Sequence, residues 1–298
     1  QWGYVVRGIL DDRIPSGTIY KGVKVVGRIE NIHYILPENK LDEIAITLAL
    51  KDYDHLEYIV DLCEKSGVHT KFIPDYNSLV PSHPYTEDLM GLPVINIRYV
   101  ALTNTLNWVA KRVVDVTGSF VGILLSSPLM LAAAVSIKLT SKGPVIFKQE
   151  RVGLHNKNFK MYKFRTMEMQ KPTAEQKGWT VKDDPRVTKI GKLLRRTSLD
   201  ELPQLFNILM GDMSLVGPRP ERPQFVEKFK EEIPRYMIKH QVRPGLTGWA
   251  QINGYRGDTS IRKRIEYDLF YIENWSMAFD FRIMFLTIFK GFINKNAY

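Results

Sequence analysis

The sequence of 298 residues contains a single cysteine, Cys63, so no disulfide can form within the chain. Such a chain fits a reducing compartment. The neighbours Ile59, Val60 and Leu62 are apolar, which predicts a buried structural thiol rather than a reactive one. The six histidines have no ligand-like spacing, and we therefore expect no zinc site.

The start of the sequence has neither a secretory signal peptide nor an initiator methionine. The chain begins inside a strand-like pattern, and we expect an upstream part to be missing. The glycine fingerprint G-x-G-x-x-G of dinucleotide-binding domains is also absent. We therefore assign no nucleotide to the front of the chain and favour a regulatory or scaffolding role for it.

Basic residues are scarce in the front of the chain and abundant behind it. Residues 1–100 carry 10 Lys and Arg against 14 Asp and Glu, a balance of −4, whereas residues 101–298 carry 32 against 18, a balance of +14. The apolar content of 44% is enough for a sizeable core. The back half is thus expected to meet an anionic partner, which charge alone leaves open between nucleic acid, lipid headgroups and phosphorylated substrates.

The front of the chain alternates strand and helix patterns. Strands are predicted at residues 4–10, 23–26, 43–50, 68–73 and 92–97, with a capped amphipathic helix at 52–65. This alternation predicts an α/β fold with a Rossmann-like parallel sheet over residues 1–98. Residues 99–112 are read as a linker into a second, mainly helical domain that covers 99–298.

An uncharged run of 22 residues from Val116 to Ile137 follows the linker. At about 1.5 Å per residue, such a helix is long enough to cross a hydrocarbon layer of about 30 Å. Ser127 and Pro128 interrupt the run, and proline breaks or kinks a helix. The pattern predicts a re-entrant helix-break-helix hairpin at about 109–139, because two half-length helices reach only midway into the bilayer.

Basic residues flank the run on both sides. Lys111 and Arg112 precede it, and the residues that follow it are Lys138, Lys142, Lys148 and Arg151. Both ends therefore look cytosolic by the positive-inside tendency, which a re-entrant, monotopic hairpin satisfies. A kinked transmembrane helix and a buried core helix remain alternatives.

The rest of the second domain has weaker signals. Strands are predicted at 145–147 and 159–165 with a turn at 149–153 between them, then a polar loop at 168–184 and an amphipathic helix at 186–196. The apolar stretch 279–293 suits a helix in the membrane interface, and a core helix fits it equally well.

Asp200 and Glu201 are adjacent carboxylates at the start of an apolar-periodic helix. With Ser198 they match a capping box, a purely structural motif in which acidic residues complement the helix dipole. Pro203 argues against that interpretation. If Ser198 were the cap, Pro203 would lie far enough into the helix that its missing N–H would cost a backbone hydrogen bond. The helix is therefore expected to start nearer Asp200.

Basic residues surround this pair in the sequence. Arg219 lies between two prolines, where a fixed backbone would aim its guanidinium at a phosphate or a base. Each basic residue alone reads as a solvated surface charge, but together they predict an anion site. The candidate ligands of that site are Lys163, Arg165, Arg195, Arg196 and Arg219, the last of which is held between Pro218 and Pro220.

Six motifs in the back half resemble one bacterial family. They are FKQERVG at 147–153, KFRTM at 163–167, DPRVT at 184–188, TSLDELPQ at 197–204, GDMSLVGPRP at 211–220 and RPGLTG at 243–248. In this order they resemble the polyprenyl-phosphate sugar-1-phosphate transferases, over about residues 108–298. The front resembles the Rossmann-like, CoA-binding-like module of large members, whose four N-terminal membrane helices are missing here.

The resemblance implies transfer of a sugar 1-phosphate, with glucose and galactose as common choices, from a UDP-sugar to undecaprenyl phosphate with Mg²⁺. It places the protein on the cytoplasmic face of the bacterial cell membrane, at the first membrane step of exopolysaccharide, capsule or O-antigen synthesis. It implies that Asp200 is the nucleophile, with Glu201 as its partner, and that the prolines and Arg219 contact the nucleotide. Lys111 and Arg112 would be the basic anchor, with Ser127 and Pro128 at the helix break.

The chemistry of the residues agrees with a covalent route. A carboxylate that forms a bond to the sugar phosphate and displaces UMP divides the transfer between two anionic substrates into two steps. Asp200 and Glu201 are also the best metal ligands, because Mg²⁺ prefers one or two carboxylates plus substrate oxygens. A nucleic-acid-binding protein is the alternative, but it leaves the uncharged run unexplained, and we expect no nucleic acid as partner. A sensor or assembly module with residual catalysis, based on the front domain, also stays open, and so does a homo-oligomer.

Overall fold

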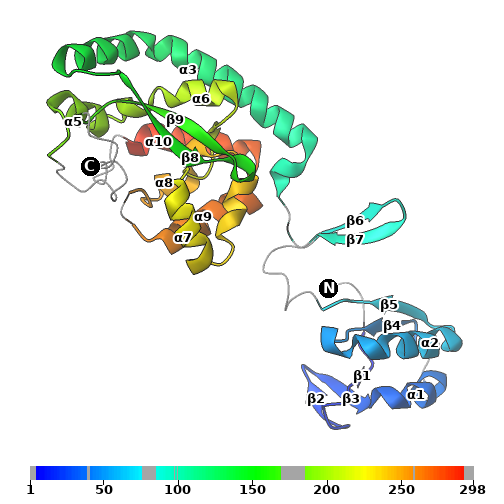
Figure 1. The fold of residues 1–298 in the computed structure, drawn as a ribbon. Coiled ribbons are helices and arrows are strands. Elements are labelled where there is room, and N and C mark those ends of the chain that lie inside the picture. Colours follow the sequence, from blue (N-terminus) through cyan, green and yellow to red (C-terminus); the bar gives the residue numbers. More distant parts are fainter. Residues whose placement is uncertain are drawn as a thin grey trace. The chain divides into compact units, whose positions relative to one another are not determined.

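A computed structural model describes residues 5–38, 41–75, 85–96, 98, 100–168, 185–257 and 259–291. The chain divides into two compact units, Gln1–Arg98 and Tyr99–Tyr298. Small sheets and helices make up the first unit, and helices dominate the second, so the fold is mixed α/β (Figure 1).

The first unit contains short strands in three small sheets. In the first sheet, β3 (Val23–Gly27) pairs in parallel with β1 (Ile9–Leu10) and antiparallel with β2 (Ile19–Tyr20). In the second, β4 (Glu43–Ile46) and β5 (His69–Phe72) are parallel. The third is the antiparallel hairpin of β6 (Tyr85–Leu89) and β7 (Leu92–Asn96). The parallel pairing agrees with the sequence analysis, but the described residues do not join into one Rossmann-like sheet.

Helices cover the core of the first unit. They are η1 (Ile29–Asn31), α1 (Ile32–Glu38), η2 (Leu50–His55) and α2 (Leu56–Ser66). The buried side chains of Ile32, Ile46, Ile59 and Cys63 form its centre, and each buried isoleucine contributes about 1.5 to 3 kcal/mol. Burial raises the pKa of the Cys63 thiol. The prediction of a buried structural thiol is therefore confirmed.

The second unit consists of a long helix, a β-hairpin and a group of shorter helices. Its elements are η3 (Ala101–Thr103), α3 (Thr105–Thr140), β8 (Ile146–Val152), η4 (Leu154–Asn156), β9 (Asn158–Phe164), α5 (Lys189–Arg196), η5 (Leu199–Glu201), α6 (Gln204–Met210), β10 (Ser214–Val216), α7 (Pro223–Glu232), η6 (Tyr236–Gln241), β11 (Gly245–Thr247), α8 (Trp249–Ile252), α9 (Ile261–Glu273) and α10 (Met277–Gly291).

Several predicted boundaries in this unit were wrong. Residues 105–112 belong to α3 rather than to a linker, because Asn104 caps the helix by accepting a hydrogen bond from the amide of Leu106 at 3.0 Å. Residues 149–152 of the predicted turn lie inside β8, and the chain turns instead at His155 and Asn156, both with positive φ. The strand predicted at 159–165 is confirmed as β9. The helix predicted at 186–196 is confirmed as α5 from Lys189 on, and the one predicted at 279–293 is confirmed as α10 up to Gly291, the last described residue. The loop predicted at 168–184 lies outside the described residues apart from Glu168.

The helix break expected at Pro128 is not seen, because α3 runs unbroken from Thr105 to Thr140. Proline has no N–H to donate to the carbonyl four residues earlier, here that of Leu124. The hydroxyl of Ser127 donates to this carbonyl at 2.8 Å, and that of Ser126 donates to the carbonyl of Gly122 at 2.6 Å. Ser127 therefore supplies the hydrogen bond that Pro128 cannot make, and Ser126 adds a second side-chain bond one turn earlier in the helix.

α3 arches along one side of the second unit, over α6 and the β8–β9 hairpin (Figure 1). Its buried residues, Lys111, Asp115, Ser119, Ala133 and Ile137, lie on both sides of the proline and face the rest of this unit. Only 11% of its most apolar 18-residue window is buried, and by length and composition it could cross a membrane. The alternative of a buried core helix is therefore wrong.

Two short parallel strands, β10 and β11, approach each other closely at glycines. A Cβ atom on Gly217 would lie 2.4 Å from the carbonyl oxygen of Arg243, and one on Gly245 would lie 2.1 Å from the amide of Gly217. Glycine is thus required at both positions by backbone packing. This packing fixes where the segment Pro218–Pro220 leaves β10.

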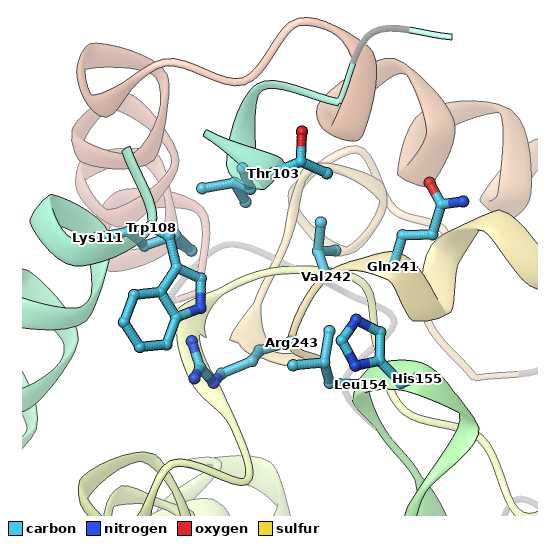
Figure 2. A pocket seen from close by; sticks show the side chains of 9 residues that line it. Thr103, Trp108, Lys111, Leu154, His155, Gln241, Val242 and Arg243 are labelled. Atoms are coloured by element: carbon cyan, nitrogen blue, oxygen red, sulfur yellow. The ribbon is translucent and has the colours of Figure 1, made fainter. Parts of the chain in front are cut away.

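A cavity of about 310 Å³ lies near the start of α3 (Figure 2). Trp108 and Arg243 line one side, with the guanidinium carbon of Arg243 5.0 Å from the centre of the indole ring, and His155 and Gln241 line another. Asp200 and Glu201 are not among the residues around it, so this cavity is separate from the predicted carboxylate site.

Candidate active site

Asp200 and Glu201 lie in η5, a single 3₁₀ turn between α5 and α6. Ser198 adopts a left-handed conformation with φ of 54°, and its side chain makes no cap hydrogen bond. The capping-box reading is therefore wrong. α6 begins at Gln204, directly after Pro203, where the missing N–H of proline has no helical partner to lose.

The buried amide of Asn207 fixes α6 against β9. Its Oδ1 accepts a hydrogen bond from the amide of Tyr162 at 2.9 Å, and its Nδ2 donates to the carbonyl of Lys160 at 2.8 Å. Buried apolar side chains, Met161 of β9 and Ile208 of α6 among them, pack in the same cluster. Lys163, at the end of the same strand, is thereby held beside the carboxylates.

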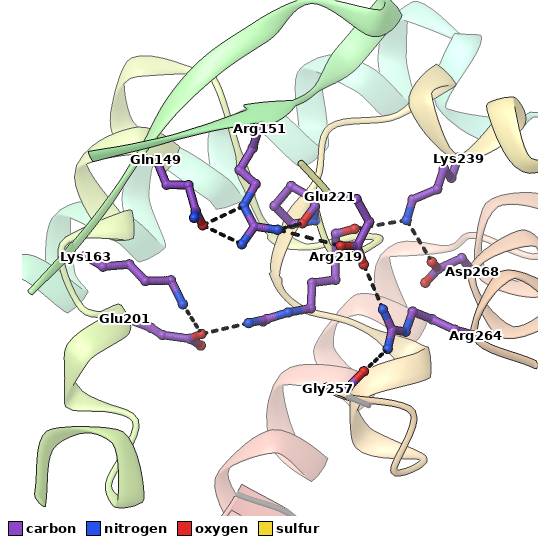
Figure 3. Close-up of polar contacts among 11 residues, drawn as sticks. Gln149, Arg151, Lys163, Glu201, Arg219, Glu221, Lys239, Gly257, Arg264 and Asp268 are labelled. Carbon is purple, nitrogen blue, oxygen red and sulfur yellow. Dashed lines mark hydrogen bonds and ion pairs between the residues drawn. The ribbon is translucent and has the colours of Figure 1, made fainter. Parts of the chain in front are cut away.

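Glu201 is buried and is in contact with three cations from three parts of the chain. Its Oε1 is 2.8 Å from Nζ of Lys163 and 3.0 Å from Nη2 of Arg219, and Figure 3 shows the two approaching from different sides. Its Oε2 is 3.1 Å from Nη2 of Arg256, which lies between α8 and α9. Both carboxylate oxygens are therefore already in ion pairs.

Asp200 is equally buried but makes no hydrogen bond or ion pair with any other residue that the structure describes. Burial raises the pKa of its carboxyl group, against the opposing effect of Lys163, Arg256 and Arg195. Burial alone would also raise the pKa of Glu201, but Lys163, Arg219 and Arg256 outweigh it and hold that pKa well below its usual range. The two adjacent carboxylates are thus in opposite electrostatic situations.

Other predicted ligands lie near the pair to different degrees. Arg195, at the end of α5, donates from Nε to the hydroxyl of Thr166 at 2.9 Å and contributes positive charge at Asp200. Pro218 and Pro220 are buried on either side of Arg219, and Arg196 is exposed on the last turn of α5. The structure therefore brings Lys163, Arg195 and Arg219 around the carboxylates.

Arg165 is held away from the carboxylates by the end of α3. Its Nη1 donates to the carbonyl of Lys142 at 2.8 Å, and its Nη2 donates to that of Ser141 at 2.9 Å. These contacts are structural, and a role for Arg165 in substrate binding stays a prediction.

The predicted basic anchor also faces inward. Nζ of Lys111 is 2.6 Å from Oδ2 of Asp280 in α10 and donates to the carbonyl of Val216 at 3.0 Å. Arg112 donates to the carbonyls of Ile208 and Leu209 at the end of α6, at 2.6 and 2.8 Å. The structure thus uses both residues to join α3 to the rest of the unit, and the lipid contacts expected for them stay predictions.

A second set of buried charges holds the Pro218–Pro220 segment from behind (Figure 3). Lys239 donates to the carbonyl of Arg219 at 3.0 Å, and Arg151 donates to that of Pro220 at 2.9 Å. Arg264 pairs with Glu221 at 2.7 Å. This set orients Arg219 toward Glu201.

Sequence reasoning missed Arg256 and Arg264. Arg256 lies 55 positions from Glu201, in a glycine-rich turn that reads equally well as a plain loop, and Arg264 is in a basic run of α9 that reads as a solvated face. The signal that could have found Arg256 is its place between Tyr255 and Gly257, in a stretch rich in glycine. Arg264 gave no such signal.

The described residues include no cluster of three or more His, Cys, Asp or Glu side chains that could hold a metal ion. Mg²⁺ needs fewer protein ligands, since it commonly binds one or two carboxylates together with substrate phosphates. Asp200 fits this requirement because its carboxylate has no partner among the described residues. Both oxygens of Glu201 are already paired, which leaves Asp200 as the more open donor.

The second unit therefore combines a buried carboxylate pair, a group of cations and a long, exposed apolar helix. These features define an α/β protein with an anion-handling site beside a helix of membrane length. The chain belongs to the bacterial sugar transferase family, whose sequence profile matches residues 106–294. A profile described as a CoA-binding domain matches residues 1–74.

Relatives with assigned names match nearly the whole chain. The UDP-glucose:undecaprenyl-phosphate glucose-1-phosphate transferases of Klebsiella pneumoniae and Escherichia coli K12 are 42% and 39% identical over 300 residues, covering 99% of this chain and 64% of each relative. The UDP-N-acetylgalactosamine-undecaprenyl-phosphate N-acetylgalactosaminephosphotransferase of Aeromonas hydrophila is 51% identical over 182 residues, covering 60% of this chain and 42% of that protein. The chain thus spans less than two thirds of the length of these relatives.

Proposed function

We propose that this chain transfers glucose 1-phosphate from UDP-glucose to undecaprenyl phosphate and releases UMP. The names of two relatives that match 99% of the chain support the reaction and the sugar. The observation that carries the proposal is the carboxylate pair, in which Asp200 has no partner among the described residues and Glu201 gathers three cations. Such a site suits the diphosphate of a nucleotide sugar.

In the first step, a carboxylate oxygen of Asp200 attacks the phosphorus that carries the sugar. The bond from this phosphorus to the oxygen of UMP breaks, and UMP leaves with the bonding electrons. In the second step, an oxygen of undecaprenyl phosphate attacks the same phosphorus and displaces the Asp200 carboxylate. The acceptor needs no strong base, because a phosphate monoester has a second pKa of about 6 and is largely ionised at neutral pH.

The cations have separate tasks in this mechanism. Lys163, Arg219 and Arg256 are held in place by Glu201 and offset the charge of the diphosphate as it meets the Asp200 carboxylate. Arg195 adds positive charge on the α5 side. Mg²⁺, held by Asp200 and the substrate phosphates, would supply further charge neutralisation on the leaving UMP.

We further propose that α3 is embedded in one leaflet and that the protein is monotopic, on the cytoplasmic face of the membrane. Both halves of α3 bury residues against the same unit, Lys111 and Asp115 before the proline and Ala133 and Ile137 after it. Because α3 packs against this one unit both before and after the proline, a position along one face of the membrane is favoured over a straight span. The exposed Lys138, Lys142 and Lys148 suit anionic headgroups.

The direct test is UMP release by membranes that contain the protein, supplied with undecaprenyl phosphate, Mg²⁺ and a panel of UDP-sugars. We expect release with UDP-glucose that depends on the lipid acceptor, and much less with UDP-galactose or UDP-N-acetylgalactosamine. Preference for another sugar would correct the donor, and no release with any UDP-sugar would refute the proposed reaction.

A further inference from the structure

Arg264 in α9 contacts two segments that each deliver an arginine to Glu201 (Figure 3). Its Nη1 is 2.7 Å from Oε1 of Glu221, which lies two residues after Arg219. Its Nη2 donates to the carbonyl of Gly257 at 2.6 Å, and Gly257 directly follows Arg256. One buried guanidinium thus contacts both segments from the side away from Glu201.

We propose that Arg264 is a positioning residue, which sets the separation of Arg219 and Arg256 and thereby shapes the anion site. This inference rests on the proposed function, since the two arginines are assigned there to the diphosphate. Arg264 touches neither Asp200 nor Glu201 in any contact of the described residues, so it acts through the two segments.

The chemistry of arginine suits this task. A planar guanidinium presents donors in fixed directions, so one side chain can hold a carboxylate and a backbone carbonyl at a set angle. Lysine has a single ammonium on a flexible stem and could keep the pair with Glu221 but not the fixed link to Gly257. In the contacts of the described residues, Arg151 and Lys239 reach the Pro218–Pro220 segment but not the segment of Gly257, whereas Arg264 contacts both Glu221 and Gly257.

Stability alone does not account for this charge. Arg264 is 2% exposed, and its Nε has no hydrogen-bond partner among the described residues. A buried ion pair often adds little net stability over apolar residues of similar volume, because removing both charges from water opposes their attraction. Retaining such a group is therefore explained better by the geometry that it imposes on the two segments.

Hydrogen exchange of the full chain in detergent tests the proposal without reference to activity. In Arg264→Gln we expect amides in residues 217–222 and 253–257 to exchange at least about tenfold faster, with the β8–β9 hairpin unchanged. In Arg264→Lys we expect faster exchange only in residues 253–257. Arg262→Gln, an exposed position on the same helix, is the matched control and should resemble the unaltered chain. A uniform rise throughout the second unit in both Arg264 variants, or no change in residues 253–257, would overturn the proposal.

A double-mutant comparison of UMP release then tests whether the contacts of Arg264 matter for the reaction. Arg264→Gln should slow release by roughly 10- to 100-fold in the unaltered chain, as expected for loss of a residue that orients others. In a chain that already carries Arg256→Gln, the further loss should fall below about threefold, since one of its two targets is gone. An equal loss in both backgrounds would contradict the proposal. If the unaltered chain releases no UMP, the proposed reaction fails, and the exchange data still decide whether Arg264 holds both segments.

Discussion

Asp200 and Glu201 are neighbours in the sequence, but the cost of ionising the carboxyl group differs between them. Glu201 is ionised at little cost, because Lys163, Arg219 and Arg256 surround it and keep its pKa low. Asp200 is buried without a direct partner among the described residues, and its pKa is raised. A reactive carboxylate that is poorly stabilised in the resting protein is what a nucleophile requires, because attack then relieves an unfavourable charge.

The first prediction is that neutralising the two carboxylates changes stability in opposite directions. Glu201→Gln leaves three partly buried cations without their partner and should lower the free energy of unfolding by about 3 to 5 kcal/mol. Asp200→Asn removes a poorly compensated charge and should raise it by roughly 0.5 to 2 kcal/mol. Denaturant unfolding in detergent measures both, with the exposed Glu266→Gln as control. Destabilisation by both substitutions would show that Asp200 is held by contacts that this account lacks.

The second prediction concerns the pH dependence of that difference. The pKa of Asp200 is higher in the folded protein than its value of about 3.9 in an unfolded chain, so ionisation of Asp200 opposes folding. This penalty is fully present above the folded pKa and vanishes below about pH 3.9, where both states are protonated. The stability advantage of Asp200→Asn should therefore shrink as the pH is lowered toward 4. An advantage that stays constant with pH would contradict a raised pKa.

At the scale of single elements, α3 has two notable features. A side-chain hydrogen bond replaces a missing backbone bond, and one face of the helix is apolar and exposed. Ser127 supplies the hydrogen bond that Pro128 cannot make, and the exposed face carries large apolar side chains such as Leu125 and Leu131. In lipid, a backbone carbonyl without a protein partner cannot form a hydrogen bond with water. The Ser127 hydroxyl would therefore matter more in lipid than in a helix of a soluble protein. Ser127 thus helps to keep α3 continuous at the proline.

The third prediction is that a charge on the exposed face of α3 weakens membrane association without unfolding the protein. Leu125 is 78% exposed, and Leu125→Asp should weaken binding by up to about 3 kcal/mol, the cost of an aspartate in the bilayer centre. Partitioning between liposomes and buffer measures this change. Leu92→Asp is the control, since Leu92 is 67% exposed on β7 in the first unit. Equal partitioning of the two variants would argue against α3 as the membrane element.

The element predictions show what local patterns can and cannot specify. β9, α5 and α10 were predicted because their apolar spacing follows the period of each structure, whereas the break at Pro128 was expected from the propensity of proline alone. The hydroxyl of Ser127 makes the hydrogen bond that Pro128 lacks, and the helix continues. The helix propensity of proline does not take such a side-chain contact into account. Arg256 was missed for a related reason, because its partner is distant in sequence and only the folded path of the chain brings them together.

At the scale of the whole molecule, the two units have separate hydrophobic clusters. One is centred on Ile32, Ile46 and Ile59, and others lie wholly between Val100 and Ile283. The charge balance differs in the same way, with the positive excess in the back half of the chain. This separation is consistent with a catalytic second unit and a first unit of another role, for which regulation and self-association into a homo-oligomer remain predictions.

The fourth prediction is that residues 99–298 alone retain the proposed reaction. Each unit has its own core, so the second should fold without the first and release UMP at a rate within about threefold of the full chain. Residues 1–98 should release none. The comparison requires equal amounts of membrane-bound protein, measured by immunoblot. Loss of turnover in a folded, membrane-bound second unit would assign the first unit a direct part in the chemistry.

The central claim is that Asp200 carries the sugar phosphate between the donor and the lipid, and a trapping experiment tests it most directly. The detergent-purified chain is mixed with UDP-glucose and Mg²⁺ without undecaprenyl phosphate, quenched in acid, digested and analysed by mass spectrometry. We predict a burst of UMP no larger than the amount of enzyme and a hexose phosphate on the peptide that contains Asp200, with both absent in Asp200→Asn. UMP release that requires the lipid from the first turnover, with no modified peptide, would contradict the account.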